Sequence, residues 1–111
     1  MDHIEELLKL EKASKGIFRG TTRESISAVI RAFDSKIIEI KSKSGEEKKE
    51  AIKGQLTVAQ ALRHDAVRRG ANSYKDPRWA SAAVVESWLL LLRDGTPEVI
   101  QTAESIIDRM R

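Results

Sequence analysis

A single carboxylate, Glu86, lies in the most apolar stretch of the chain and is the first candidate for chemistry. It is the only charged residue between Trp79 and Leu92, where two serines are the only other polar side chains. A carboxylate held among apolar side chains can serve as a general acid or base. Carboxylates in such positions are more often held in structural ion pairs. We therefore expect Glu86, a buried-charge candidate, either to face an edge of the bundle or to pair with a base such as Arg63 or Arg78.

The sequence offers nothing that would complete a catalytic or metal site around Glu86. Its two histidines, His3 and His64, are too far apart in sequence to form a metal-ligand spacing, and it has no cysteine. We find no glycine-rich phosphate loop, no HExxH motif and no recognisable setting for a serine or lysine nucleophile. We accordingly expect no catalytic residue, no bound metal and no cofactor.

Positive charge is concentrated in residues 63–79, which carry five basic and two acidic residues. Arginine and lysine bind phosphate, and aromatic rings stack on unpaired bases, so this region is a candidate nucleic-acid surface. Its aromatic residues also have a simple structural explanation, since Trp79 begins the apolar stretch and Tyr74 can close the loop before it. The excess is weaker than the basic face of a dedicated nucleic-acid binder. The binding candidates are Arg63, His64, Arg68, Arg69, Tyr74, Lys75, Arg78 and Trp79.

Helices joined by short connections are the elements that would position these residues. Apolar residues recur at helical spacing over most of the chain, and no segment shows the alternation typical of a strand. The spacing predicts helices over about 3–15, 22–43, 46–69, 77–93 and 97–110. In the third of these the apolar stripe is Ile52, Leu56, Ala59, Leu62, Ala66 and Val67, with Arg63 projecting onto it.

Several helix starts and stops are marked by residue type. Asp76-Pro77 and Thr96-Pro97 combine a capping side chain with a proline in the first turn. Gly54 lies inside the third predicted helix, where it would mark a kink, a close helix crossing or a break. Capping boxes are predicted for Asp2 with Glu5, Thr21 with Glu24 and Ser44 with Glu47, a helix stop at Gly16, and a core plug for Ile17 and Phe18.

We predict an all-α fold for residues 1–111, a single-domain bundle of about five mostly antiparallel helices. Its centre is the apolar helix over 77–93, which is too short to cross a bilayer, because that takes about 18 or more apolar residues. The first twelve residues are acidic and amphipathic, unlike a secretory signal. From these features we expect a cytoplasmic protein that does not bind membranes.

The four consecutive leucines near the end of the central helix suggest a second contact surface. Side chains in such a run point to all sides of a helical turn, so a bundle this small is expected to leave part of the run exposed. Ile38 falls off the apolar stripe of its own helix. Both features favour self-association, with a symmetric dimer as the expected form. The interface candidates are Ile38, Leu89, Leu90, Leu91 and Leu92.

The sequence is most consistent with a non-enzymatic helical module that binds another protein. Such a module would act as a small inhibitor or adaptor, or as a small subunit of a larger assembly. One alternative is a nucleic-acid-binding accessory protein that uses residues 63–79. A more distant alternative is a small-ligand binder or enzyme with Glu86 between helices.

Overall fold

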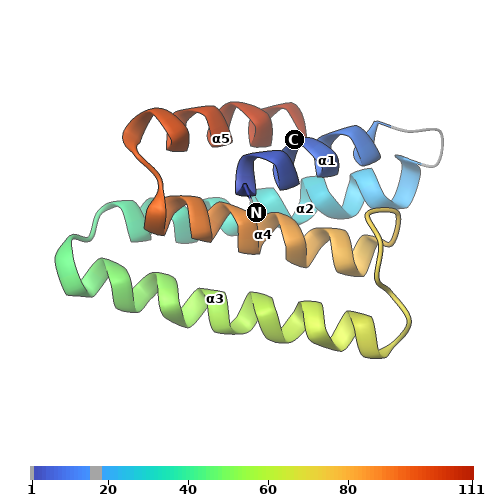
Figure 1. Ribbon diagram of the computed structural model, residues 1–111, viewed down its shortest axis with the longest axis horizontal. Coiled ribbons are helices and arrows are strands. Elements are labelled where there is room, and N and C mark those ends of the chain that lie inside the picture. The colour runs from blue at the N-terminus through green and yellow to red at the C-terminus, as the bar shows by residue number, and fades with distance from the viewer. Residues whose placement is uncertain (1, 16–18) are drawn as a thin grey trace.

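Five α-helices account for most of the chain in the computed structural model, which describes residues 2–15 and 19–111 (Figure 1). No strand is present in these two segments, so the predicted all-helical bundle is confirmed. The helices are α1 (His3–Ser14), α2 (Arg19–Lys41), α3 (Gly45–Arg68), α4 (Pro77–Asp94) and α5 (Pro97–Arg109). None of the helices in these segments is both long enough and apolar enough to span a membrane.

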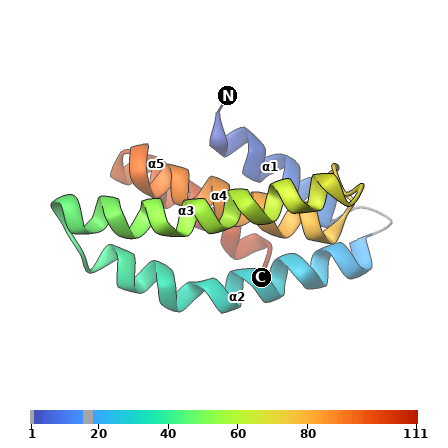
Figure 2. The same ribbon diagram turned by 90° about the horizontal axis from the view of Figure 1, so that it is seen from below.

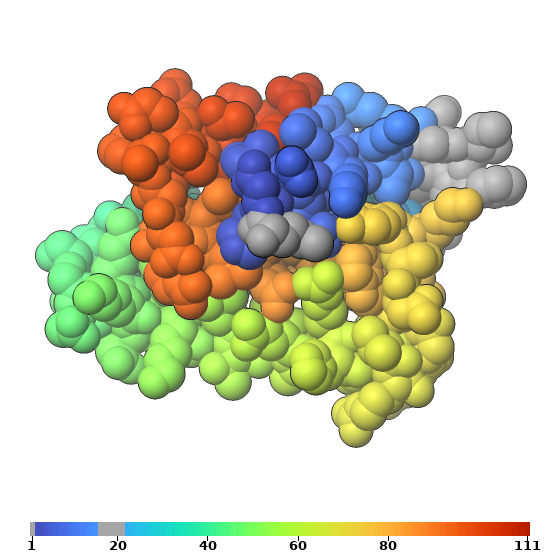
Figure 3. Space-filling view, viewed as in Figure 1, coloured from blue at the N-terminus to red at the C-terminus, as the bar shows by residue number. Residues whose placement is uncertain are grey.

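Helix α4 is the centre of the bundle, as its composition predicts. It packs against each of the other four helices, and 11 of its 18 residues are buried. In Figure 1, α4 lies in front of α2 and above α3; Figure 2, seen from below, shows α2 and α3 running antiparallel, with α4 behind α3. In the space-filling view of Figure 3, α1 and α5 form the upper part of the molecule and α3 its lower edge. Helix α4 is therefore covered on nearly every side.

Most of the predicted helix starts are confirmed by side-chain hydrogen bonds. Asp2, Asp76 and Thr96 are N-caps whose side chains accept backbone N–H groups of the first turns of α1, α4 and α5. Two starts differ. Ser44 occupies the N-cap of α3 without a side-chain cap bond, and α2 begins at Arg19, so Thr21 lies within that helix. Gly16, Ile17 and Phe18 lie outside the described residues.

The prediction that the leucine run at residues 89–92 leaves an exposed patch is wrong for the monomer. Leu89, Leu91 and Leu92 are buried, and Leu90 is half-buried against the core. The reason is that α4 has neighbours on all sides, so a helical turn that is apolar all round is covered by the chain itself. Ile38, the other interface candidate, is 70% exposed on α2.

Helix α3 continues without interruption through Gly54. A Cβ atom placed on Gly54 would meet nothing within 4 Å, so this glycine does not mark a close crossing within the monomer. The predicted apolar stripe of α3 is only partly correct. Ile52, Leu56, Ala59 and Ala66 are buried, whereas Leu62 and Val67 are exposed. The buried side of α3 is narrower than its apolar pattern, because only α4 and part of α1 and α2 lie against it.

Candidate functional site: the two sides of helix α3

One side of α3 carries a partly buried arginine, Arg63, held between two other helices. Its guanidinium pairs with the carboxylate of Glu86 from α4, and its Nη2 lies 3.6 Å from Oε1 of Glu6 in α1. Glu6 is buried, and 27% of the Arg63 side chain is exposed. This is the structural pairing that the sequence suggested for Glu86. Arg63 therefore neutralises part of a two-carboxylate cluster that joins three helices.

Two aromatic side chains complete the surroundings of Arg63. The guanidinium carbon of Arg63 lies 4.4 Å from the ring centroid of Trp79, a cation–π contact. Tyr74 packs edge-on against Trp79, and its hydroxyl donates a hydrogen bond of 2.8 Å to Oε2 of Glu6. Burial and the neighbouring Glu6 carboxylate raise the pKa of Tyr74. These contacts stabilise the cluster and give each aromatic residue a structural role.

The cluster changes the interpretation of the basic region at residues 63–79. Of three binding candidates, Trp79 is buried and Arg63 and Tyr74 are half-buried, and all three are engaged in this cluster, which leaves little of their surface free for stacking. The physical reason is that helical spacing carries Arg63 onto the α4 side of α3, where Trp79 and two carboxylates receive it. Sequence spacing placed Arg63 on the stripe, but could not show which partners lie opposite.

The remaining basic side chains lie at one end of the bundle and are partly neutralised. Arg68 and Arg69 share the carboxylate of Asp65, at 3.1 and 2.9 Å. Arg78 pairs with Asp76 at 3.2 Å, an interaction that lowers the pKa of that carboxyl group. Two other candidates, His64 and Lys75, are exposed. This end keeps positive charge, although less of it is free than the sequence suggests.

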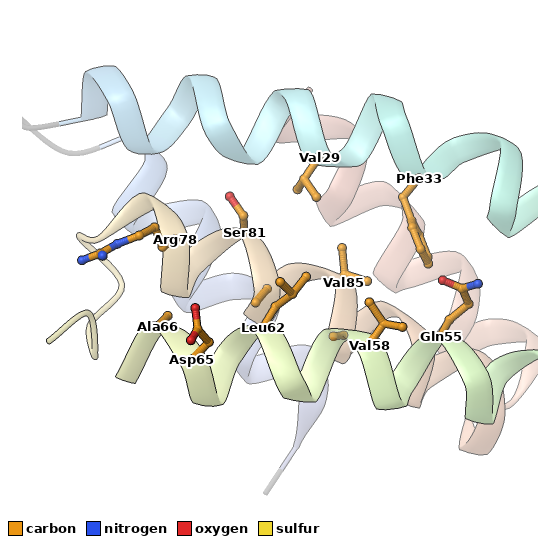
Figure 4. Close-up of a pocket in the computed structure, with 12 residues that line it drawn as sticks. Val29, Phe33, Gln55, Val58, Leu62, Asp65, Ala66, Arg78, Ser81 and Val85 are labelled. Carbon is orange, nitrogen blue, oxygen red and sulfur yellow. The ribbon is translucent and has the colours of Figure 1, made fainter. Parts of the chain in front are cut away.

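On its other side, α3 borders an apolar groove that the sequence analysis missed. The groove has a volume of about 400 Å³ and lies between α2 and α3, with α4 as its floor. Figure 4 shows Val29 and Phe33 of α2 and Leu62 of α3 directed into this space. The wall residues are Val29, Phe33, Gln55, Val58, Ala59, Leu62, Asp65, Ala66, Arg78, Ser81, Ala82 and Val85.

The groove is open because α2 and α3 pack less closely against each other than against α4. Val58 is 54% exposed and Leu62 is 58% exposed. The chain does not lack charged residues for its surface, since they make up 33% of the sequence. Such exposed apolar side chains, gathered in one concave site, mark a binding surface more often than scattered ones do. The sequence did contain a signal for this groove in the apolar pattern of α3. With Val58 included, that pattern is too wide to form a single buried stripe.

Polar groups are confined to the ends of the groove. Asp65, Arg78 and Ser81 lie at one end and Gln55 towards the other (Figure 4). The single wall carboxylate, Asp65, is already bonded to two arginines, so no free pair of titratable groups faces this space from the walls. The arrangement suits the binding of an apolar surface with charged or polar ends.

Comparison with models of known protein families, with curated proteins and with solved structures found no match to this chain.

Proposed function

We propose that this chain is a non-enzymatic protein-interaction module that binds a helix in the groove between α2 and α3. The observation that carries the proposal is that two apolar side chains, Val58 and Leu62, are exposed on the rim of a mostly apolar groove. A groove between two helices accepts the apolar face of a third, with anchor side chains spaced at i, i+3 or i+4, and i+7. Burial of these anchors would supply most of the binding free energy.

Catalysis gains little support from the surroundings of Glu86. Its carboxylate is engaged by Arg63, and the same arginine lies near Glu6, so the group serves to hold α1, α3 and α4 together. The nucleic-acid alternative depends on Arg68, Arg69 and Arg78, each of which pairs with an aspartate. Exposed ion pairs of this kind do not prevent phosphate binding, but they lower the charge that draws a nucleic acid to the surface.

Affinity capture with a matched pair of variants tests the proposal. Leu62→Lys places a charge on the groove rim, whereas Ile38→Lys places the same charge on an exposed apolar position of α2 that does not line the groove. We expect the tagged wild-type chain and Ile38→Lys to retain the same protein partner, including untagged copies of the chain, and Leu62→Lys to lose it. Retention that disappears on nuclease treatment, or that is equal in all three proteins, would contradict the proposal.

A further inference from the structure

The outer side of α3 beside the groove is a continuous strip without charge at its centre. Gly54, Val58, Ala61 and Leu62 follow one another at spacings of four, three and one, so they lie on one side of the helix. All four are exposed. A Cβ atom on Gly54 would meet nothing within 4 Å, and the small side chain of Ala61 leaves similar room. This strip permits another helix to approach α3 closely.

The two ends of the strip carry opposite charge. Glu47 and Glu50 precede Gly54 by seven and four residues, which places them on the same side of α3. Arg68 follows Ala61 by seven residues and Arg69 follows Leu62 by seven, so both lie at the other end of the strip. All four of these charged side chains are exposed. The strip therefore runs from an acidic end through an apolar centre to a basic end.

The basic end keeps a positive charge despite its internal ion pairs. Arg68 and Arg69 share a single carboxylate, that of Asp65, so one positive charge is left over. At the acidic end, Glu46 lies four residues before Glu50 and shares its side of α3, whereas its partner Lys49 projects from another side. The charges that face along the strip are thus acidic at its start and basic at its finish.

We propose that the occupant of this face is a second copy of the chain, with the two α3 helices antiparallel across a two-fold axis near Val58 and Ala61. An antiparallel arrangement places Glu47 and Glu50 of each copy opposite Arg68 and Arg69 of the other. A parallel arrangement would place like charges together at both ends. The two-fold axis makes the same strip serve both copies, as an isologous interface requires. This inference rests on the proposed function, because it identifies α3 of a second copy as the helix that packs against Val58 and Leu62 and covers the groove.

The arrangement also explains the exposed apolar side chains of α3. Val58 and Leu62 of one copy would pack against the apolar centre of the partner helix and close the open side of the groove. Gly54 would allow close approach of the two helix backbones at each end of the apolar centre. The charged ends would set the antiparallel orientation, since complementary charge fixes register and orientation at helix interfaces.

Charge reversal tests the antiparallel pairing. In one variant, Glu47→Lys/Glu50→Lys, both ends of the dimer become basic; in the other, Arg68→Glu/Arg69→Glu, both become acidic. We expect the wild-type chain to sediment as a dimer at tens of micromolar and low salt, and each variant alone to dissociate at least tenfold more readily. An equimolar mixture of the two variants should regain wild-type association, because every contact between unlike copies is again between opposite charges.

The controls separate this inference from the proposed function. Circular dichroism must show that both charge variants keep the wild-type helix content, and Ile38→Lys should leave the dimer intact.

Four outcomes would each overturn the inference. They are a monomeric wild-type chain, a dimer unaffected by either charge variant, a mixture that fails to associate, and a dimer lost in Ile38→Lys. A monomer that still captures another protein through Leu62 would leave the proposed function standing. If the dimer forms through the charged ends but Leu62→Lys captures partner proteins as well as wild type does, the proposed function of the groove would be contradicted instead.

Discussion

Leu62 and Arg63 are neighbours in α3, yet the apolar side chain lies outside and the charged one inside. More than half of the leucine is exposed on the groove rim, whereas the arginine lies over Trp79 and pairs with Glu86. An exposed leucine alone needs no explanation, but an arginine among buried partners does. The difference shows that α3 has two unlike sides, one that joins the bundle and one that is open to solvent and that we propose binds a partner.

The two sides also differ in what their loss would cost. The Arg63 side contains two carboxylates that depend on one cation, so its contribution is to the free energy of folding. Oε1 of Glu6 accepts no hydrogen bond from any described residue and relies on the charge of Arg63. The Leu62 side contributes little to folding, because its side chains meet solvent. Substitutions on the Arg63 side should therefore lower the free energy of unfolding, whereas substitutions on the Leu62 side should weaken association.

Arg63→Met should have the largest effect on stability. It leaves Glu6 and Glu86 without their cation, and removing one partner of a buried ion pair costs about 3–5 kcal/mol. The matched control is Arg68→Met, an exposed member of a surface pair, which should cost less than about 1 kcal/mol. Urea denaturation measures both. If Arg63→Met lowers the free energy of unfolding no more than the control does, the distinction between the two sides of α3 is lost.

Leu56→Ala and Leu62→Ala form the next comparison, because the same change is made at two positions of α3 that are six residues apart. Leu56 is 6% exposed, so its truncation should cost about 2–5 kcal/mol. For Leu62 we expect a cost below about 1 kcal/mol at protein concentrations where the chain is monomeric. Equal losses in urea denaturation would mean that Leu62 is part of the core.

The acid sensitivity of the fold should depend on an ion pair that joins α1 and α5. Bonds from Arg109 hold the pKa of Glu11 at about 2, below its ordinary value of 4.5. A folded-state pKa below the unfolded one adds stability above about pH 4.5, and that stability is lost as the pH falls towards 2. Compared with wild type, Glu11→Gln should be about 1–2 kcal/mol less stable at pH 7 and should lose less on acidification. Parallel curves of stability against pH would contradict this assignment.

Gly54→Ala should produce the smallest change, and with the opposite sign. Glycine inside a helix costs about 1 kcal/mol relative to alanine, and a Cβ atom here meets nothing in the monomer. We expect the monomer to gain about 0.5–1 kcal/mol in thermal or urea denaturation. A loss of stability would show that Gly54 is in contact with something within the single chain.

The sequence predicts the architecture well because the relevant signals are local. Asp76-Pro77 and Thr96-Pro97 mark helix starts through bonds within one turn, and the apolar stretch after Trp79 must be covered on most sides. The candidate site is harder, because it depends on distances between helices. Spacing placed Leu62 in the core, and only the separation of α2 from α3 leaves it in a groove. The cover over Leu89 to Leu92 likewise depends on how closely the other four helices surround α4.

The most direct test of the two-sided helix is the mass in solution of the wild-type chain and of Leu62→Lys, measured by light scattering at the same micromolar concentration. We predict a wild-type mass of twice the 12.5 kDa chain and a monomeric mass for the variant, with unchanged helix content. A monomeric wild type, or a dimer that persists unchanged in Leu62→Lys, would contradict the claim that the open side of α3 binds a second copy.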